Sequence, residues 1–247
     1  MSKIYADTIE TENSNVDITL GAAGDAVLIP TGATLKTNII QDAEGNNIIT
    51  SNGSGTLTLP TGVFGGAMNL LQTINLAAPN EYAEITTGID STYDVYRISF
   101  AGITPGTDNV NFQVSAATPG HGAGSWGVTK TSALWEAYNA EAGGGGWDYN
   151  NSYDAAQDSG AQVLGAAVGS DSDQCLVGDF YLFSPSNTTY VTLYTFNSQH
   201  YQKDNYSIWI FGGGYYNTTA AIDKLKFYMS SGVIEEGIIK MYGISKS

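Results

Sequence analysis

The sequence predicts an all-β protein with an N-terminal β-rich segment and a C-terminal β-sandwich of jelly-roll type. Short stretches that alternate apolar and polar residues recur along the chain, turns rich in Gly, Asn and Pro separate them, and no helical period repeats. Charged residues make up only 13% of the 247 residues, while glycine (30) and tyrosine (16) are abundant. This composition suits sheets whose outer faces are solvated by hydroxyl and amide groups.

The N-terminal segment reads as short strands separated by turns. The predicted strands are residues 3–9, 16–20, 26–29, 34–40, 47–50 and 56–59. Turn signals such as Ser51-Asn-Gly-Ser-Gly55 lie between them. Because there is no Trp or Phe before Phe64, these strands have too few large side chains to bury both of their faces alone. We expect residues 1–62 to pack on other copies of the chain or on a host structure; a flexible polar tail is the alternative.

The boundary between the two parts is marked by Pro60-Thr-Gly-Val-Phe-Gly-Gly66, and we assign residues 63–69 to a linker and residues 70–247 to the sandwich. The predicted strands of the sandwich are longer and more aromatic: 70–76, 82–86, 93–100, 110–115, 162–168, 175–183, 190–196 and 207–211. Residues 132–140 could instead form a helix. The remainder of 116–160 is predicted to form long loops rich in Gly and Trp.

The last stretch, residues 222–244, is predicted to form a closing β-hairpin. Each of its two strands has an apolar face, made of Leu225, Phe227 and Met229 and of Ile239, Met241 and Gly243. Ser230-Ser-Gly232 supplies the turn between them. Counting this hairpin as two strands gives about ten strands for the sandwich.

Charge and cysteine content exclude several classes of protein. Nine basic residues against 24 acidic ones give a formal net charge of −15, so nucleic acid and anionic membrane surfaces are not expected partners. No apolar stretch reaches the length of a signal peptide core or of a membrane span, so no membrane insertion is predicted. The single cysteine, Cys175, excludes an internal disulfide and is expected to be a buried structural thiol.

No catalytic arrangement emerges from the nucleophiles and bases. The two histidines, His121 and His200, are both expected in surface loops. Gly124-Ser-Trp-Gly127 misses the nucleophile-elbow pattern, because Ala123 stands where its first glycine is needed. We therefore predict that the protein is not an enzyme.

Acidic residues in the predicted loops are the alternative source of chemistry. Paired carboxylates can hydrolyse glycosidic bonds, and the candidates are Glu136, Glu141, Asp148, Asp154 and Asp158, although nothing in their spacing specifies a reaction. Asp171 and Asp173, or Asp154 and Asp158, could offer oxygen ligands to calcium, but neither pair has the spacing of a known calcium loop. No metal site and no cofactor are predicted.

Aromatic residues give the strongest functional signal. Flat rings with a polar tip suit sugar faces and protein hot spots, because they offer a large rigid contact area with little entropy to lose. The predicted contact residues are Trp126, Trp135, Tyr138, Trp147, Tyr149, Tyr153, Tyr201, Tyr215 and Tyr216. The alternative is that most of them fill the core or a subunit interface.

Several segments carry a resemblance to a known family. Tyr93-Asp-Val-Tyr-Arg-Ile-Ser-Phe100, residues 178–187 and Gly237-Ile-Ile-Lys-Met-Tyr-Gly-Ile244 resemble the β-sandwich domains at the C-termini of bacteriophage tail and fibre proteins. Ile4-Tyr-Ala-Asp-Thr-Ile9 resembles N-terminal segments of predicted fibre proteins from marine bacteriophages. The resemblance covers residues 70–245 and departs from the family between 116 and 160.

This resemblance implies a virion structural protein, a short trimeric tail fibre or spike that adheres to a host-surface glycan or protein without catalysis. A homotrimer is expected both from the resemblance and from the weak core of residues 1–62, which would bind other virion proteins. Such a protein would assemble in the bacterial cytoplasm and be released by lysis. A capsid or tail decoration protein that binds no receptor, and a polysaccharide-degrading fibre, are the two alternatives.

Overall fold

The computed structural model describes residues 39–41, 47–51, 57–58, 68–77, 79–120 and 125–245. The chain divides into two compact units, residues 1–64 and 65–247. Every regular element in the described residues is a β-strand, so the predicted all-β class is confirmed.

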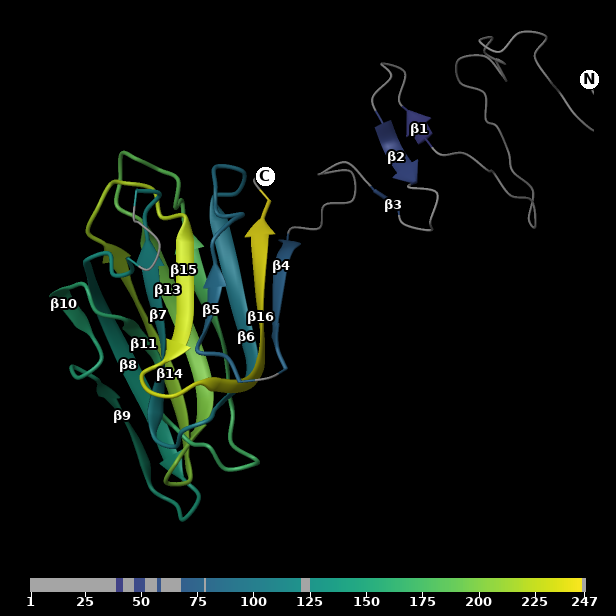
Figure 1. Cartoon of the computed structure of the whole chain (residues 1–247). Helices are drawn as coiled ribbons and strands as arrows, with labels where there is room; N and C mark the ends of the chain where they lie inside the picture. The colour runs from purple at the N-terminus through teal and green to yellow at the C-terminus, as the bar shows by residue number, and fades with distance from the viewer. Residues whose placement is uncertain are drawn as a thin grey trace, which may run out of the picture. The chain divides into compact units, whose positions relative to one another are not determined.

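The first unit contains a small antiparallel sheet of three strands, β1 (Ile39–Gln41), β2 (Asn47–Ser51) and β3 (Leu57–Thr58), in that order (Figure 1). These strands correspond to the last three predicted for the N-terminal segment. The strands predicted within residues 3–29 lie outside the described residues.

The second unit is a β-sandwich. Within residues 68–245 its thirteen strands are β4 (Met68–Leu76), β5 (Tyr82–Ile85), β6 (Val95–Pro105), β7 (Val110–Ala117), β8 (Lys130–Ala140), β9 (Gly145–Tyr149), β10 (Ala155–Asp158), β11 (Gln162–Val168), β12 (Leu176–Phe183), β13 (Leu193–Gln202), β14 (Tyr206–Tyr216), β15 (Lys224–Met229) and β16 (Ile234–Ile244). All of their pairings are antiparallel.

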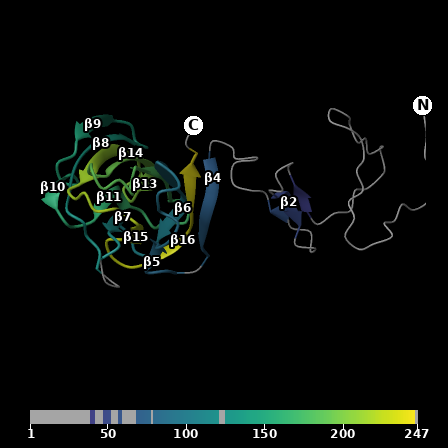
Figure 2. The ribbon, with the colours of Figure 1, turned by 90° about the horizontal axis from the view of Figure 1, so that it is seen from above.

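The strands form two layers, which we call the front sheet and the back sheet. The front sheet has the order β4-β16-β6-β12-β13-β14-β8, with β9 and β10 both paired to the outer edge of β8. The back sheet has the order β11-β7-β15-β5. Seen from above, β8, β14 and β13 lie over β11, β7 and β15 (Figure 2).

The two layers are joined at both sides. On one side, β11 and β13 share a single residue pair, Val168 with Gln202. On the other, an isolated bridge links Asn80 to Ile234 at the start of β16. These contacts nearly close the sandwich into a barrel.

The core lies between the layers because every second residue of each strand points inward. Phe100 of β6, Phe112 of β7 and Phe227 of β15 are each at most 1% exposed and meet across the layers. The ring centroids of Phe100 and Phe112 are 5.3 Å apart, and those of Phe112 and Phe227 are 6.0 Å apart. Burial of each such ring stabilises the fold by about 1.5–3 kcal/mol, so this cluster holds the two sheets together.

The predicted closing hairpin is wrong in its pairing, although its two strands and its turn are correct. β15 pairs with β5 and β7 in the back sheet, whereas β16 pairs with β4 and β6 in the front sheet. The turn at Gly232, whose φ is +73°, therefore carries the chain from one layer to the other. The physical reason is burial: the two apolar faces point toward each other across the core, as a flat hairpin would not allow.

The prediction of long loops over residues 116–160 is also wrong. This region contains β8, β9 and β10, and residues 132–140 belong to a strand rather than a helix. All eleven residues of β8 pair with β14, and this pairing outweighs the local preference. β4 begins at Met68, within the range 63–69 that was assigned to the linker.

Candidate functional site

The outer side of the front sheet carries a cluster of aromatic side chains, which we call the aromatic face: Trp135, Trp147, Tyr149, Trp209 and Phe211. The register of the strands aligns them in two rows. Phe211 of β14 lies opposite Trp135 of β8, which lies opposite Tyr149 of β9. In the adjacent row, Trp209 and Trp147 flank the small residue Ala137. Residues i and i+2 of one strand share a face, and directly paired residues on adjacent strands also lie on one face. All five rings therefore project from the same side of the sheet.

The rings of the aromatic face support one another and stay open to solvent. Trp135 lies 5.0 Å from Trp147 and 5.6 Å from Tyr149, measured between ring centroids, and Trp209 lies 5.0 Å from Phe211. Trp147 is 69% exposed and Trp209 is 48% exposed. Scattered exposed apolar residues are ordinary on a protein surface, whereas a contiguous group of large rings marks an interaction site.

Polar but uncharged side chains lie beside the aromatic face. Asn197 and Gln199 of β13 are paired with Phe211 and Trp209, and the Gln199 Nε2 donates a hydrogen bond to Ser207 Oγ at 2.9 Å. Further across the sheet, Asp179 accepts two hydrogen bonds from Arg97, at 2.7 and 3.1 Å, so these two charges neutralise each other. The aromatic face therefore combines rings with amide and hydroxyl groups and little net charge.

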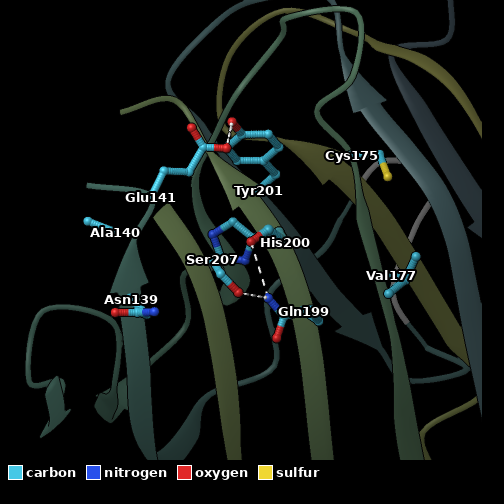
Figure 3. Close-up of a pocket in the computed structure, with 9 residues that line it drawn as sticks. All are labelled: Asn139, Ala140, Glu141, Cys175, Val177, Gln199, His200, Tyr201 and Ser207. Carbon is cyan, nitrogen blue, oxygen red and sulfur yellow. Dashed lines mark hydrogen bonds between the residues drawn. The ribbon is translucent and has the colours of Figure 1, made fainter. Parts of the chain in front are cut away.

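Two hollows lie on the same side of the front sheet, at opposite ends of the β13–β14 pair. The first, which we call the Tyr201 hollow, has a volume of about 460 Å³ and is lined by Asn139, Gln199, Tyr201 and Ser207 among others (Figure 3). The second, the Tyr215 hollow, has a volume of about 480 Å³ and is lined by Phe183, Leu193, Thr195, Gly213 and Tyr215. The aromatic rings of β14 lie between them.

The Tyr201 hollow has a polar rim. The Tyr201 hydroxyl donates a hydrogen bond to Glu141 at 2.8 Å, and this bond raises the pKa of Tyr201 to about 12 (Figure 3). The phenol is therefore a neutral hydrogen-bonding group at physiological pH.

His200 and Cys175 border the same hollow, but neither lies where the sequence suggested. His200 belongs to β13, is 2% exposed and is not in a surface loop. Its Nε2 lies 2.7 Å from the carbonyl oxygen of Ala166, and burial lowers the pKa of the imidazole to about 4. Cys175 is half-buried rather than buried. His121 lies outside the described residues.

The structure gathers some of the predicted contact residues and separates others. Trp135, Trp147 and Tyr149 form much of the aromatic face, but on strands β8 and β9 rather than in loops. Tyr215 and Tyr201 lie at the two hollows on the same sheet.

The other four predicted residues lie elsewhere. Tyr138 and Tyr153 pack against the core, and Tyr216 is only 1% exposed, so it is not available to a ligand. Trp126 lies beside the back sheet, and its ring centroid is 5.9 Å from the Nζ of Lys226. Lys226 belongs to β15 and also sits 3.9 Å from the ring centroid of Tyr82. These positions divide the predicted group between two faces and the interior.

Trp209 and Phe211 belong to the aromatic face but were not among the predicted contact residues. They lie within Tyr206-Ser-Ile-Trp-Ile-Phe211, which was predicted as a strand from residue 207 onward. The signal was available: Ile208 and Ile210 alternate with the two rings, so burying the isoleucines necessarily turns both rings outward.

Of the acidic candidates, Glu136 and Asp148 do not face the aromatic rings. Glu136 is paired with Asp148 across β8 and β9, and both alternate with the outward rings, so their side chains project from the other side of that ribbon. Burial raises the pKa of Glu136, although a hydrogen bond from Asn150 opposes the change. Asp154 accepts a hydrogen bond from the Tyr149 hydroxyl at 2.5 Å. No cluster of three or more His, Cys, Asp or Glu side chains suited to a metal ion occurs in the described part of the chain.

Comparison of the chain with protein families, curated proteins and solved structures finds no match. No helix long and apolar enough to cross a membrane occurs among the described residues. A fold class alone does not imply an activity, so the function of this protein has to be inferred from the geometry of its surface.

Proposed function

We propose that this chain is an adhesion protein that binds an uncharged glycan on the aromatic face. The observation that carries the proposal is the contiguous set of exposed rings on β8, β9 and β14, bordered by amides and hydroxyls. The apolar C–H faces of a sugar ring stack on flat aromatic rings, and its hydroxyls exchange hydrogen bonds with side chains such as Asn197 and Gln199. Binding of this kind needs no catalytic group.

The charge distribution supports an uncharged ligand. The protein carries a net charge of −15, so an acidic polymer would be repelled by the molecule as a whole. Arg97, the only arginine of the chain, is already engaged by Asp179. Neutral sugars avoid both problems.

We place this adhesion protein on a bacteriophage virion, as a short trimeric fibre or spike with residues 1–62 attached to the particle. The support is the sequence resemblance of the segments around 93–100 and 237–244, together with the separation of the chain into units 1–64 and 65–247. Three copies on one particle would add avidity to a weak single site.

A capsid or tail decoration protein is the second candidate, and the edge strand β4 favours it. Among the described strands β4 pairs with β16 alone, and it exposes Met68 (42%) and Leu70 (55%). An uncharged free edge with exposed apolar residues can pair with another chain. In that function the aromatic face would be covered by a neighbouring subunit.

A test compares Trp147→Ala and Trp209→Ala with Trp126→Ala in affinity electrophoresis through gels containing neutral bacterial polysaccharides. Each of the first two changes should weaken retention about tenfold, equivalent to about 1.4 kcal/mol, because an exposed ring makes its contacts with the ligand. Trp126→Ala is the matched control, since Trp126 lies by the back sheet, and it should leave retention unchanged.

Sedimentation of the same variants separates the two candidates. If Trp147→Ala lowers the oligomer mass while no polysaccharide retards the wild-type protein, the aromatic face is a subunit interface and the decoration function holds. Retention that is equal in all three variants would contradict glycan binding on this face.

A further inference from the structure

The two hollows lie at opposite ends of β13, and Trp209 and Phe211 of the adjacent strand β14 lie beside the part of β13 between them. The Tyr215 hollow is lined by Leu193 and Thr195 at one end of the strand, and the Tyr201 hollow by Gln199 and Tyr201 at the other. Asn197 lies midway between these pairs and also points outward. At about 3.3 Å per residue, the path from Leu193 to Tyr201 is roughly 26 Å long.

The neighbouring strands give this path two unequal sides. On the β14 side stand Trp209 and Phe211, and on the β12 side stand Val177, Asp179 and Tyr181. Gly213 interrupts the β14 side beyond Phe211, and the missing side chain opens the Tyr215 hollow. The rings therefore border the middle of the path, and both of its ends are hollowed.

We propose that the ligand is a linear, uncharged polysaccharide that is bound along β13 through an internal stretch of its chain, with one segment in each hollow and the segment between them against Trp209 and Phe211. This inference rests on the proposed function and adds the class of ligand and its direction on the sheet. A single terminal sugar would fill one hollow and leave the other hollow and the path beside Trp209 and Phe211 without a contact.

The charged groups along the path agree with an uncharged chain. Glu141 borders the Tyr201 hollow, where it accepts the hydrogen bond from Tyr201. Asp179 lies beside the middle of the path and is neutralised by Arg97. An acidic polysaccharide would bring its carboxylates or sulfates close to Glu141, which is unfavourable.

The experiment is isothermal titration of the full chain with neutral oligosaccharides of increasing length, cut from the polysaccharide that gives retention in the gels. Affinity should rise with length and reach a plateau only when the oligosaccharide spans both hollows, with a gain of about tenfold from the shortest binder to the plateau. A ligand that matches full affinity as a mono- or disaccharide would overturn the inference.

Two blocking variants test the position of the chain. Thr195→Tyr fills the Tyr215 hollow and Ser207→Tyr fills the Tyr201 hollow; both residues are exposed on strands, where tyrosine is well tolerated. Each variant should lower the affinity of the longest oligosaccharide about tenfold and change that of the shortest binder less than about threefold. Gln113→Tyr on β7 of the back sheet is the matched control and should match the wild type at every length.

The outcomes distinguish this inference from the proposed function. If binding requires Trp147 and Trp209 but does not depend on length or on the blocking variants, the aromatic face binds glycan and the linear arrangement is wrong. If no oligosaccharide of any length binds and the tryptophan variants behave as the wild type, the proposed function itself fails.

Discussion

At the scale of single residues, several polar groups inside the sandwich make specific hydrogen bonds. The Tyr194 hydroxyl donates to Gln162 at 2.9 Å, and the Gln162 amide donates to the carbonyl of Tyr153 at 3.1 Å. His200 contacts the carbonyl of Ala166, but its Nδ1 has no protein partner among the described residues. Burial of the His200 imidazole strongly disfavours its charged form.

The burial of His200 predicts a dependence of stability on pH. Its pKa is about 4 in the folded protein against an ordinary value of 6.5, so above pH 6.5 the imidazole is neutral in both states. As the pH falls from about 6.5 to about 4, the unfolded chain takes up a proton that the folded protein does not, and the free energy of unfolding falls by about 3 kcal/mol. Urea denaturation at several pH values measures this loss.

The variant His200→Gln isolates the contribution, because glutamine keeps a donor for the Ala166 carbonyl but does not titrate. Its free energy of unfolding should fall less than that of the wild type between pH 6.5 and pH 4, by about the same 3 kcal/mol. His121→Gln, at the other histidine of the chain, is the matched control. An unchanged pH dependence in His200→Gln would show that this imidazole titrates normally in the fold.

The sequence indicated which aromatic residues are candidates for ligand contact, but not whether each of them faces solvent or the core. Trp135, Trp147 and Tyr149, which were predicted as contacts, lie together on an exposed surface, whereas Tyr216 is buried. A tyrosine near the end of a strand has the same local sequence signal whether it faces solvent or core. Only the register of β14 against β8 decides this, and register depends on contacts between residues far apart in the chain.

At the scale of strands, β14 shows how glycines allow close packing next to the site. Gly212, Gly213 and Gly214 lie between β13 and β8. A Cβ atom at Gly214 would lie 2.3 Å from the backbone oxygen of Thr131, which is far inside contact distance. The three glycines thus let β14 approach both neighbours where a side chain would push them apart.

The change Gly214→Ala should therefore destabilise the sandwich by about 1–3 kcal/mol, because the backbone of β8 must move to admit the methyl group. Thermal or urea denaturation measures the difference. Gly120→Ala is the matched control, since nothing lies within 4 Å of a Cβ atom there, and it should change stability by less than about 0.5 kcal/mol. Equal stability of the two variants would mean that β14 is not packed as closely as described.

Strand existence could be predicted better than strand pairing. The alternation in residues 224–229 and 234–244 correctly predicted two strands and a turn, yet the pairing of these strands with different sheets could not be read from it. The same apolar faces fit a hairpin or a crossing between layers, and the choice depends on the rest of the core. The glycine-rich stretch of 145–149 hid β9 for a related reason, because its strand forms only by pairing with β8.

At the scale of the whole molecule, a strongly acidic protein presents one nearly neutral aromatic surface. The Debye screening length falls from about 10 Å at 0.1 M salt to about 3 Å at 1 M salt, but contacts made by stacking and hydrogen bonding persist over this range. Attraction between charges would weaken over the same range. We therefore expect glycan binding to change little between low and high salt, which distinguishes the aromatic face from an electrostatic binding site.

We infer that the outer side of the front sheet binds the glycan, and quenching of tryptophan fluorescence by acrylamide can test this through the rings themselves. Three of the four tryptophans lie on the aromatic face, and the fourth, Trp126, lies by the back sheet. Adding neutral polysaccharide in about 0.5 M salt should protect the wild type and Trp126→Phe equally from quenching, and the protection should vanish when Trp135, Trp147 and Trp209 are all replaced by Phe. Protection that survives the triple replacement, or that is lost in the Trp126→Phe variant, would contradict binding on this side of the sheet.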